Sequence, residues 1–245
     1  MSELLQLRGV QKRFDTLEVL RDVSFSVSAG ETVALLGPSG CGKTTVLRIL
    51  LGLETADGGE IQGTVDRAGY LPQGGLLFPW KTVMENAELP LELQGVRRRE
   101  RRRDVDAHLP AFGLVGFQGA YPNELSGGMQ QRAALLRALM TGAPVLVLDE
   151  PFGALDVLTR QRMQNWLADL VGQWDRTLLF VTHDLDEAVA LSGRVVLLSD
   201  RPAVVLGERR IHLDRAARRD RLGRAFLDAR DSLSATIHEG GNPDG

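Results

Sequence analysis

One stretch of the chain decides its fold: Gly37-Pro38-Ser39-Gly40-Cys41-Gly42-Lys43-Thr44. It satisfies the pattern G-x-x-x-x-G-K-[ST] at every fixed position. An apolar run at 32–36 precedes it, and a helix-like stretch at 45–51 follows it. A glycine-rich loop between a strand and a helix lets successive backbone N–H groups surround a phosphate, and the start of the helix adds partial positive charge. The stretch therefore predicts a phosphate-binding loop (a P-loop) rather than a chance glycine turn.

The residue types in this loop have specific chemical roles. Lys43 would place a full positive charge at the β- and γ-phosphates, and the Thr44 hydroxyl would be a ligand of Mg²⁺. Cys41 is the only cysteine, which excludes an intrachain disulfide. The simpler interpretation of Cys41 is a small side chain that fills space in the loop, and a redox switch is the alternative. In either case, alkylation of Cys41 should block nucleotide binding. We expect ATP and Mg²⁺ as cofactors, with nucleotide contacts from Gly37, Pro38, Ser39, Gly40, Cys41, Gly42, Lys43, Thr44 and Thr45.

A second motif is an apolar strand that ends in two carboxylates. Residues 145–148 are Val-Leu-Val-Leu, and Asp149 and Glu150 follow them. Asp149 would hold Mg²⁺ directly or through water, and Glu150 would polarise the attacking water. Many strands end in acids, so a surface acidic pair is the alternative. The phosphate-binding loop earlier in the chain favours the catalytic interpretation.

A third motif is Leu125-Ser126-Gly127-Gly128-Met129-Gln130. A serine and two glycines at the start of a helix form a second anion site. An ordinary N-capped helix is the alternative. Because one ATP needs only one phosphate-binding loop, we expect Ser126, Gly127 and Gly128 to serve the ATP of a second copy of the chain.

Hydrophobic patterning around the motifs indicates an α/β fold. Residues 4–10 and 19–27 alternate apolar and polar side chains around a turn candidate at Asp15 and Thr16, as in an antiparallel sheet with one solvated face. The stretch from 83 to about 140 has a helical, charged character. Continuous apolar runs that alternate with helical stretches predict parallel strands at 145–148, 178–181 and 195–198.

Together, the three motifs resemble those of the nucleotide-binding subunit of an ABC transporter, with Leu125–Gln130 as the signature motif of that family. The resemblance runs from about residue 4 to 205. It implies an α/β P-loop NTPase fold with a RecA-like, mainly parallel sheet core, an N-terminal antiparallel β subdomain and a helical subdomain that bears the signature. It also implies a single ABC ATPase domain over 1–245, with 4–82 and 141–205 as β subdomain and core, 83–140 as helical subdomain, and 214–245 as C-terminal helix and frayed tail.

The same resemblance implies roles for further residues. Phe14 matches the aromatic that stacks on adenine, with a core residue at a turn as the alternative. Gln73 matches the glutamine that contacts Mg²⁺ and senses the membrane subunit, with a solvated loop residue as the alternative. His183 matches the switch histidine near the γ-phosphate, with a structural histidine as the alternative. Asp156 lies in the loop that crosses to the other subunit, unless it simply caps the following helix. The implied catalytic residues are Lys43, Glu150 and His183, and the implied Mg²⁺ ligands are Thr44, Gln73 and Asp149.

The resemblance implies an ATPase that energises transport. Segments 76–80 (LLFPW), 150–156 (EPFGALD) and 184–188 (DLDEA) look like bacterial importers, most like the nitrate, sulfonate and taurine group. The implied function is ATP hydrolysis that drives uptake of a small solute, such as a sulfonate, taurine or nitrate. A soluble ABC ATPase of DNA repair or translation is the alternative. Against it, the roughly 80 residues between the two glycine motifs contain no cysteine and no sustained heptads.

The expected partners follow from the same resemblance. No stretch reaches the ~18 uninterrupted apolar residues of a membrane span, so transport requires separate membrane subunits. We expect a head-to-tail dimer on integral membrane permease subunits, peripheral at the cytoplasmic face of the inner membrane. An extracytoplasmic solute-binding protein would be an indirect partner. The net charge of −3 favours no nucleic-acid partner.

Three further segments carry weaker expectations. Segment 74–83 (GGLLFPWKTV) is unusually apolar for a loop and is the candidate docking surface for the membrane subunit, with packing inside the helical subdomain as the alternative. The arginine-rich run 97–103 is expected to be a solvated helix start, with contact to anionic lipid headgroups as the minor alternative. The tail is expected to form a packed helix containing Leu222, Phe226 and Leu233, followed by a disordered end at 240–245.

Overall fold

The computed structural model describes residues 3–63, 68–74, 77–172 and 176–240. Contacts group the chain into two compact units, one formed by 1–66 with 174–245 and the other by 67–173. These limits differ from the predicted subdomain boundaries near 82 and 140, and those boundaries stay a prediction. Both units contain fully buried apolar side chains, such as Leu35 and Leu146, so each has a core of its own.

The first unit begins with antiparallel strands. β1 (Glu3–Phe14) pairs with β2 (Leu17–Ser28) across the turn at Asp15 and Thr16, and β4 (Gly58–Gln62) pairs with β1 along its other edge. Buried and exposed positions alternate along much of β1 and β2, as the sequence pattern predicts. The expected N-terminal antiparallel strands are thus confirmed, and both extend further than the predicted ranges.

A parallel core belongs to the same unit. β3 (Thr32–Leu36) lies between β7 (Thr177–Thr182) and β8 (Arg194–Leu198) and runs parallel to both. Nearly all residues of these strands are buried, which explains why their sequences are continuous apolar runs. β9 (Ala203–Arg210) runs antiparallel to β8 and parallel to β2, so the order in this unit is β4-β1-β2-β9-β8-β3-β7.

Two helices of this unit follow core strands directly. α1 (Lys43–Leu50) follows β3 through the glycine-rich loop, and α6 (Leu185–Leu191) follows β7. The residues that follow the carboxyl ends of β3 and β7 are therefore the loop and His183. In open α/β sheets, ligand sites form at the carboxyl ends of strands.

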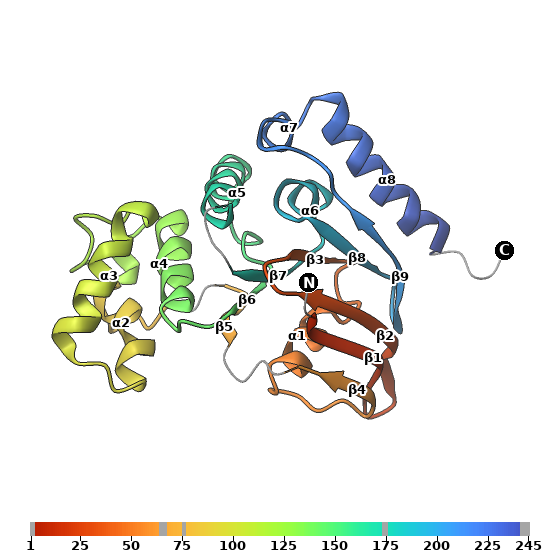
Figure 1. Cartoon of the computed structure of the whole chain (residues 1–245), viewed down its shortest axis with the longest axis horizontal. Coiled ribbons are helices and arrows are strands. Elements are labelled where there is room, and N and C mark those ends of the chain that lie inside the picture. The colour runs from red at the N-terminus through yellow and green to blue at the C-terminus, as the bar shows by residue number, and fades with distance from the viewer. Residues whose placement is uncertain (1–2, 64–67, 75–76, 173–175, 241–245) are drawn as a thin grey trace. The chain divides into compact units, whose positions relative to one another are not determined.

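The C-terminal segment covers part of the first unit. A short helix, α7 (Arg215–Arg219), leads to α8 (Arg224–Gly240), which packs against α6 and β9 (Figure 1). Phe226 and Leu233 of α8 are buried, so the predicted packed helix is confirmed. Leu222 precedes α8 and is exposed, so the prediction that the packed helix contains Leu222 is wrong. Gly240 still belongs to α8, and the rest of the end predicted to be disordered, 241–245, lies outside the described residues.

The second unit combines two parallel strands with a group of helices (Figure 1). Helices α2, α3 and α4 pack on one another, and α5 contacts α4. The strands are β5 (Ala68–Leu71) and β6 (Val145–Asp149). The helices are α2 (Val83–Leu93), α3 (Arg98–Phe112), the 3-10 turn η1 (Pro122–Glu124), α4 (Gly127–Leu139) and α5 (Val157–Val171).

The predicted fold class is confirmed. The first unit has N-terminal antiparallel strands and a parallel core that leads into the glycine-rich loop. The second unit carries the helix that starts at the signature motif. Within the described ranges, no helix is both long enough and apolar enough to cross a membrane.

Candidate functional site

The glycine-rich loop ends on a helix start that the chain itself does not cap. Gly42 is the N-cap of α1 and makes no side-chain capping hydrogen bond, and the first turn contains no acidic residue. Gly42 has φ +122°, and a Cβ there would lie 2.8 Å from Leu20 Cδ2 and 2.9 Å from Val19 Cγ1. Only glycine fits this position, because a side chain would meet both strain and a clash. The N-terminal end of α1, with its partial positive charge, is thus available to an anion.

Lys43 is held inside the same loop. Its ammonium group donates hydrogen bonds to the carbonyl oxygens of Gly37 and Pro38, both at 2.8 Å, and the residue is only 4% exposed. Among the residues that the structure describes, no carboxylate forms an ion pair with Lys43. A buried ammonium with carbonyl partners alone is a strong attractor for a phosphate, since a negative charge would neutralise it.

Arg201 supports the loop from the connection between β8 and β9. Its guanidinium donates to the carbonyl oxygen of Gly40, with Nε at 3.0 Å. Nothing in the phosphate-loop pattern points to this residue, because it lies far along the chain. Cys41 is 2% exposed, and burial raises the pKa of its thiol although the nearby Lys43 opposes that change. A buried thiol with a raised pKa fits the filler interpretation better than a redox switch.

Two other predicted residues lie in this unit. Phe14, at the end of β1, is 44% exposed, and the Lys12 ammonium lies 5.1 Å from the centre of its ring. Phe14 is therefore not a core residue, and an aromatic face on the surface can stack on a base. His183 is exposed and directly follows β7, while Asp184 caps α6.

The predicted carboxylates lie in the second unit, at the end of β6. Asp149 is 1% exposed, and the Tyr70 hydroxyl lies 3.5 Å from its Oδ2. Gln73 reaches Glu150, with Nε2 donating to Oε2 at 3.3 Å. Glu150 has φ +45°, a left-handed conformation that is uncommon for a residue other than glycine. Such backbone conformations concentrate at functional sites, and here the conformation belongs to the proposed catalytic carboxylate.

The signature motif also begins a helix. Ser126 is the N-cap of α4, but its Oγ is 3.4 Å from the Met129 N–H, and the first turn contains no acidic residue. Gln130 donates to the carbonyl oxygens of Pro122 (2.8 Å) and Leu125 (3.2 Å), which fixes the approach of the chain to the helix. This helix start is a second place where the N-terminal end of a helix lacks a negative charge.

Asp156 has a structural role. It is the N-cap of α5, and its Oδ1 accepts a hydrogen bond from the Thr159 N–H at 3.0 Å. The hydrogen bonds from Thr159 lower the pKa of this carboxyl group. The simpler interpretation, a helix cap, is therefore present in the structure, and the role at a second subunit stays a prediction.

The candidate docking segment 74–83 is described at Gly74 and 77–83, and its loop at 77–82 is held from inside by one side chain. Asn86 is completely buried. Its Oδ1 accepts from the Phe78 N–H at 2.8 Å, and its Nδ2 lies within hydrogen-bonding distance of the carbonyl oxygens of Phe78 (3.2 Å), Lys81 (2.9 Å) and Thr82 (3.0 Å). The backbone of this loop is thus fixed on α2.

In this loop, the Phe78 side chain packs inside the unit and the Trp80 side chain is exposed. Arg137 of α4 places its guanidinium 5.3 Å from the centre of the Phe78 ring, and the Trp80 ring lies 5.4 Å from the Phe78 ring. Trp80 is 69% exposed. Part of the apolar segment therefore packs within the unit, whereas Trp80 is presented to the outside. Gly75 and Leu76 of the predicted docking segment lie outside the described residues.

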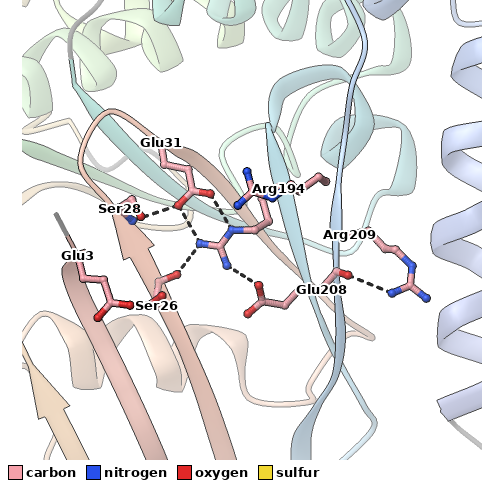
Figure 2. Close-up of a pocket in the computed structure, with 8 residues that line it drawn as sticks. Glu3, Ser26, Ser28, Glu31, Arg194, Glu208 and Arg209 are labelled. Atoms are coloured by element: carbon pink, nitrogen blue, oxygen red, sulfur yellow. Dashed lines mark hydrogen bonds and ion pairs between the residues drawn. The ribbon is translucent and has the colours of Figure 1, made fainter. Parts of the chain in front are cut away.

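A charged hollow of about 390 Å³ lies in the first unit and contains none of the predicted site residues (Figure 2). Arg194 is 7% exposed and donates to Glu31 (2.7 and 2.8 Å), Glu208 (2.6 Å) and the Ser26 carbonyl (2.6 Å). Burial tends to raise the pKa of Glu31, but hydrogen bonds from Arg194 and the Ser28 amide outweigh burial and lower it. Because Arg194 is engaged on all sides, this network ties β8 and β9 to the turn after β2.

Comparison with known proteins agrees with this set of features. The family model for the ABC transporter matches residues 20–153. The formylaminopyrimidine import ATP-binding protein ThiZ of Halalkalibacterium halodurans is 44% identical over 82% of this chain and 82% of its own length. The aliphatic sulfonates import ATP-binding protein SsuB 1 of Xanthomonas axonopodis pv. citri is 40% identical over 96% of both chains. The nitrate import ATP-binding protein NrtD of Synechocystis is 42% identical over 79% of this chain and 76% of its own.

Solved structures give the same result. The dimeric structure of the bacterial ABC transporter cassette MJ0796 matches with a TM-score of 0.73 at 30% identity, over 86% of this chain and all of that one. A second dimeric structure of MJ0796, in a post-hydrolysis state with ADP and phosphate, matches equally well. The chain therefore belongs to the ABC transporter family and is one of its ATPases.

Proposed function

We propose that this chain is the ATP-binding and ATP-hydrolysing subunit of an importer. The solute taken up is a small organic or inorganic anion, such as a sulfonate, taurine or nitrate, because relatives carry import names for aliphatic sulfonates and nitrate. The observation that carries the proposal is the pair of glycine-rich helix starts, α1 and α4, at which neither the N-cap residue nor the first turn supplies a carboxylate. One chain thus has two places for phosphate, which is what a nucleotide shared by two copies requires.

In the proposed mechanism, the first helix start binds the phosphates of ATP. The Lys43 ammonium exchanges the carbonyl oxygens of Gly37 and Pro38 for phosphate oxygens, and the amides at the start of α1 donate to the same group. Phe14 stacks on the adenine. Glu150 accepts a proton from the attacking water, and His183 contacts the γ-phosphate.

The residues present fit a magnesium ion. Among the described residues, no group of three or more histidine, cysteine, aspartate or glutamate side chains can hold a metal by itself. Mg²⁺ is commonly bound by one or two protein oxygens together with substrate phosphates and water, so single contributions from Thr44, Gln73 and Asp149 suffice. When bound, the ion would neutralise charge on the phosphates of ATP. The burial of Asp149 supports its role, since a buried carboxylate is stabilised by a nearby cation.

The second helix start would act on the ATP of another copy. Ser126, Gly127 and Gly128 would donate to the γ-phosphate across a head-to-tail dimer, in line with the dimeric structures of MJ0796. The proposed output is mechanical: ATP holds two copies together, and hydrolysis lets them separate.

The dimer is tested with Glu150→Gln, which keeps the size and hydrogen bonds of the side chain but removes the base. With saturating Mg·ATP, this variant should elute from a sizing column as a dimer, and phosphate release should fall by about 100-fold or more. The same variant with Ser126→Asp added is the matched control and should elute as a monomer. A Glu150→Gln protein that stays monomeric in ATP would count against the shared site.

The transport role requires membrane partners. We propose that permease subunits dock on the loop that presents Trp80, so that the chain is peripheral at the cytoplasmic face of the membrane, with an extracytoplasmic solute-binding protein as the source of substrate. The exposure of Trp80 and the rigid backbone beneath it support this assignment. Trp80→Ala should abolish the rise in ATPase rate caused by reconstituted permease and loaded binding protein, while the basal rate is unchanged. An ATPase rate that ignores the permease would favour a non-transport ATPase instead.

A further inference from the structure

Helix α3 begins with a dense group of arginines, most of which are exposed and form no ion pair within the described parts of the chain. Six of the seven residues in 97–103 are arginine, and five of these six are exposed. In the described parts of the chain, Arg103 is the only one of these five that forms an ion pair within 4.0 Å, with Nε 3.8 Å from Asp104 Oδ1, and Arg98 has a weaker electrostatic interaction with Glu85. The others are Arg97, Arg98, Arg99 and Arg102.

The sixth arginine, Arg101, explains why the group is rigid. Its Nε lies 3.3 Å from Glu88 Oε2 and a further nitrogen lies 3.7 Å from Glu92 Oε1, while Nη1 donates to the Val96 carbonyl at 3.4 Å. The Glu88 side chain is only 7% exposed. This partly buried ion pair fastens the first turn of α3 to α2, so the neighbouring arginines project from a fixed helix start.

These arginines weaken the helix that carries them. Arg97 is the N-cap of α3 and makes no side-chain capping hydrogen bond, whereas α2, α5 and α6 are capped by threonine or aspartate side chains. Cations in a first turn oppose the helix dipole, although Glu100 offsets part of this. The pairs Arg98/Arg102 and Arg99/Arg103 put like charges four residues apart. This arrangement costs helix stability, and Glu85, Glu100 and Asp104 balance only part of its positive charge. A negatively charged partner outside the chain would balance the rest.

The chemistry of this surface selects the kind of partner. Guanidinium groups match the geometry of phosphate oxygens. Leu93, at the end of α2 and four residues before Arg97, is 80% exposed. The segment 93–103 contains no aromatic residue on which a nucleic-acid base could stack. An exposed leucine beside a cluster of cations fits the boundary between headgroups and acyl chains of an anionic bilayer.

We propose that this surface, the arginine corner (Leu93 with 97–103), binds anionic phospholipid headgroups. The whole chain has a net charge of −3, so the attraction is local and competes with repulsion of the rest of the molecule. Binding of this kind is weakened by salt, because exposed charges are screened. The interaction is independent of the transport role, since it needs neither permease nor ATP.

The test uses the full-length purified chain and flotation with vesicles of phosphatidylcholine, alone or mixed with phosphatidylglycerol. The wild-type chain should float with the mixed vesicles and not with phosphatidylcholine alone. The variant Arg98→Gln/Arg99→Gln/Arg102→Gln/Arg103→Gln should bind the mixed vesicles on the order of 600-fold more weakly, at about fivefold for each of the four basic residues. Its thermal stability should be equal or higher, because the like charges are removed. Leu93→Ser should weaken binding by a smaller factor.

The matched control is Arg8→Gln/Arg48→Gln/Arg209→Gln/Arg224→Gln, which removes the same charge from exposed positions elsewhere. It should bind vesicles nearly as well as the wild type. If the control variant lost as much vesicle binding as the variant in the arginine corner, only the net charge of the chain would matter. If the wild-type chain floated equally well with vesicles of phosphatidylcholine alone, headgroup charge would have no role. A short RNA that binds through the same four arginines, with no flotation on anionic vesicles, would also overturn the proposal. Each of these outcomes leaves permease-stimulated ATPase, the test of the transport role, unaffected.

Discussion

The helices α1 and α4 begin differently from α5 and α6. α5 and α6 start on aspartates whose carboxylates accept short hydrogen bonds, 3.0 Å for Asp156 and 2.8 Å for Asp184. α1 starts on Gly42 with no side-chain cap, and α4 starts on Ser126 with a long one of 3.4 Å. The N-cap aspartates of α5 and α6 supply a negative charge at the helix start, whereas the two proposed phosphate sites leave that charge to the ligand.

The largest effect is expected from Lys43→Ala, which removes the charge at the first site. ATPase activity should fall by roughly 100- to 1,000-fold, the usual cost of losing one group that stabilises charge in a transition state. Phosphate release at saturating Mg·ATP is the measurement. The fold should be retained, because the Lys43 ammonium donates its hydrogen bonds to two carbonyl oxygens of its own loop and joins no other element. Turnover close to the wild-type rate would remove Lys43 from the site.

Ser126→Asp converts the start of α4 into one like that of α5. The carboxylate should cap the helix, with a gain of about 0.5 kcal/mol from the helix dipole. It should also repel the γ-phosphate and lower the ATPase rate by roughly tenfold or more. Thermal unfolding and phosphate release are measured on the same protein.

The control for this change is Ser126→Asn, which caps without charge and should keep most of the activity. If Ser126→Asp were as active as Ser126→Asn, the start of α4 would be an ordinary capped helix and the comparison with α1 would fail.

The rate at which the Cys41 thiol is alkylated measures how accessible the glycine-rich loop is. Because the thiol is 2% exposed and burial raises its pKa, iodoacetamide should modify it about tenfold more slowly in the native chain than in denaturant. The native rate should rise with pH over a higher range than for an ordinary thiol, and ATP should slow it further. Mass spectrometry gives the rates. Fast modification that ATP does not slow would mean that the loop is open.

A still smaller effect is expected from Asp156→Ala, which removes the cap of α5. Hydrogen bonds from Thr159 lower the pKa of Asp156 below its ordinary 3.8. A carboxyl with a lowered folded pKa stabilises the fold above its ordinary pKa, and the contribution is lost as pH falls through the folded value. The Tm of the variant should thus be slightly lower at neutral pH and match the wild type in strong acid. Ser126→Ala should lower the Tm by less, because the capping hydrogen bond of Ser126 is longer than that of Asp156. A larger loss of Tm in Ser126→Ala than in Asp156→Ala would contradict this order.

Local patterns were enough to predict the parts nearest the chemistry. β3 occupies the predicted residues 32–36, and α1 follows the glycine loop as expected, because both depend on short-range pattern and loop chemistry. Asp149 and Glu150 lie at the end of β6, a strand that its continuous apolar sequence is enough to predict. The helix at the signature was likewise evident from its glycines.

Other elements depend on distant partners and give little local signal. β4 has the sequence GGEIQ and is largely exposed, and β5 has only four residues, so neither shows a strand periodicity. β9 pairs with both β2 and β8, a position that only the complete sheet defines. Arg201 reaches Gly40 across 161 positions of sequence, and Arg194 reaches Glu31 across 163. Contacts between such distant residues cannot be derived from a pattern in one window.

Asn86 holds the loop at 77–82 through backbone atoms alone, the N–H of Phe78 and the carbonyl oxygens of Phe78, Lys81 and Thr82. Every amino acid except proline offers the same main-chain groups, so the shape of this loop is largely insensitive to the identity of its exposed side chains. The tip at Trp80 can therefore diversify among relatives without a cost to folding. With the proposed docking at Trp80, exchange of a few exposed residues would redirect the subunit to a different membrane partner, while its ATPase remains unchanged.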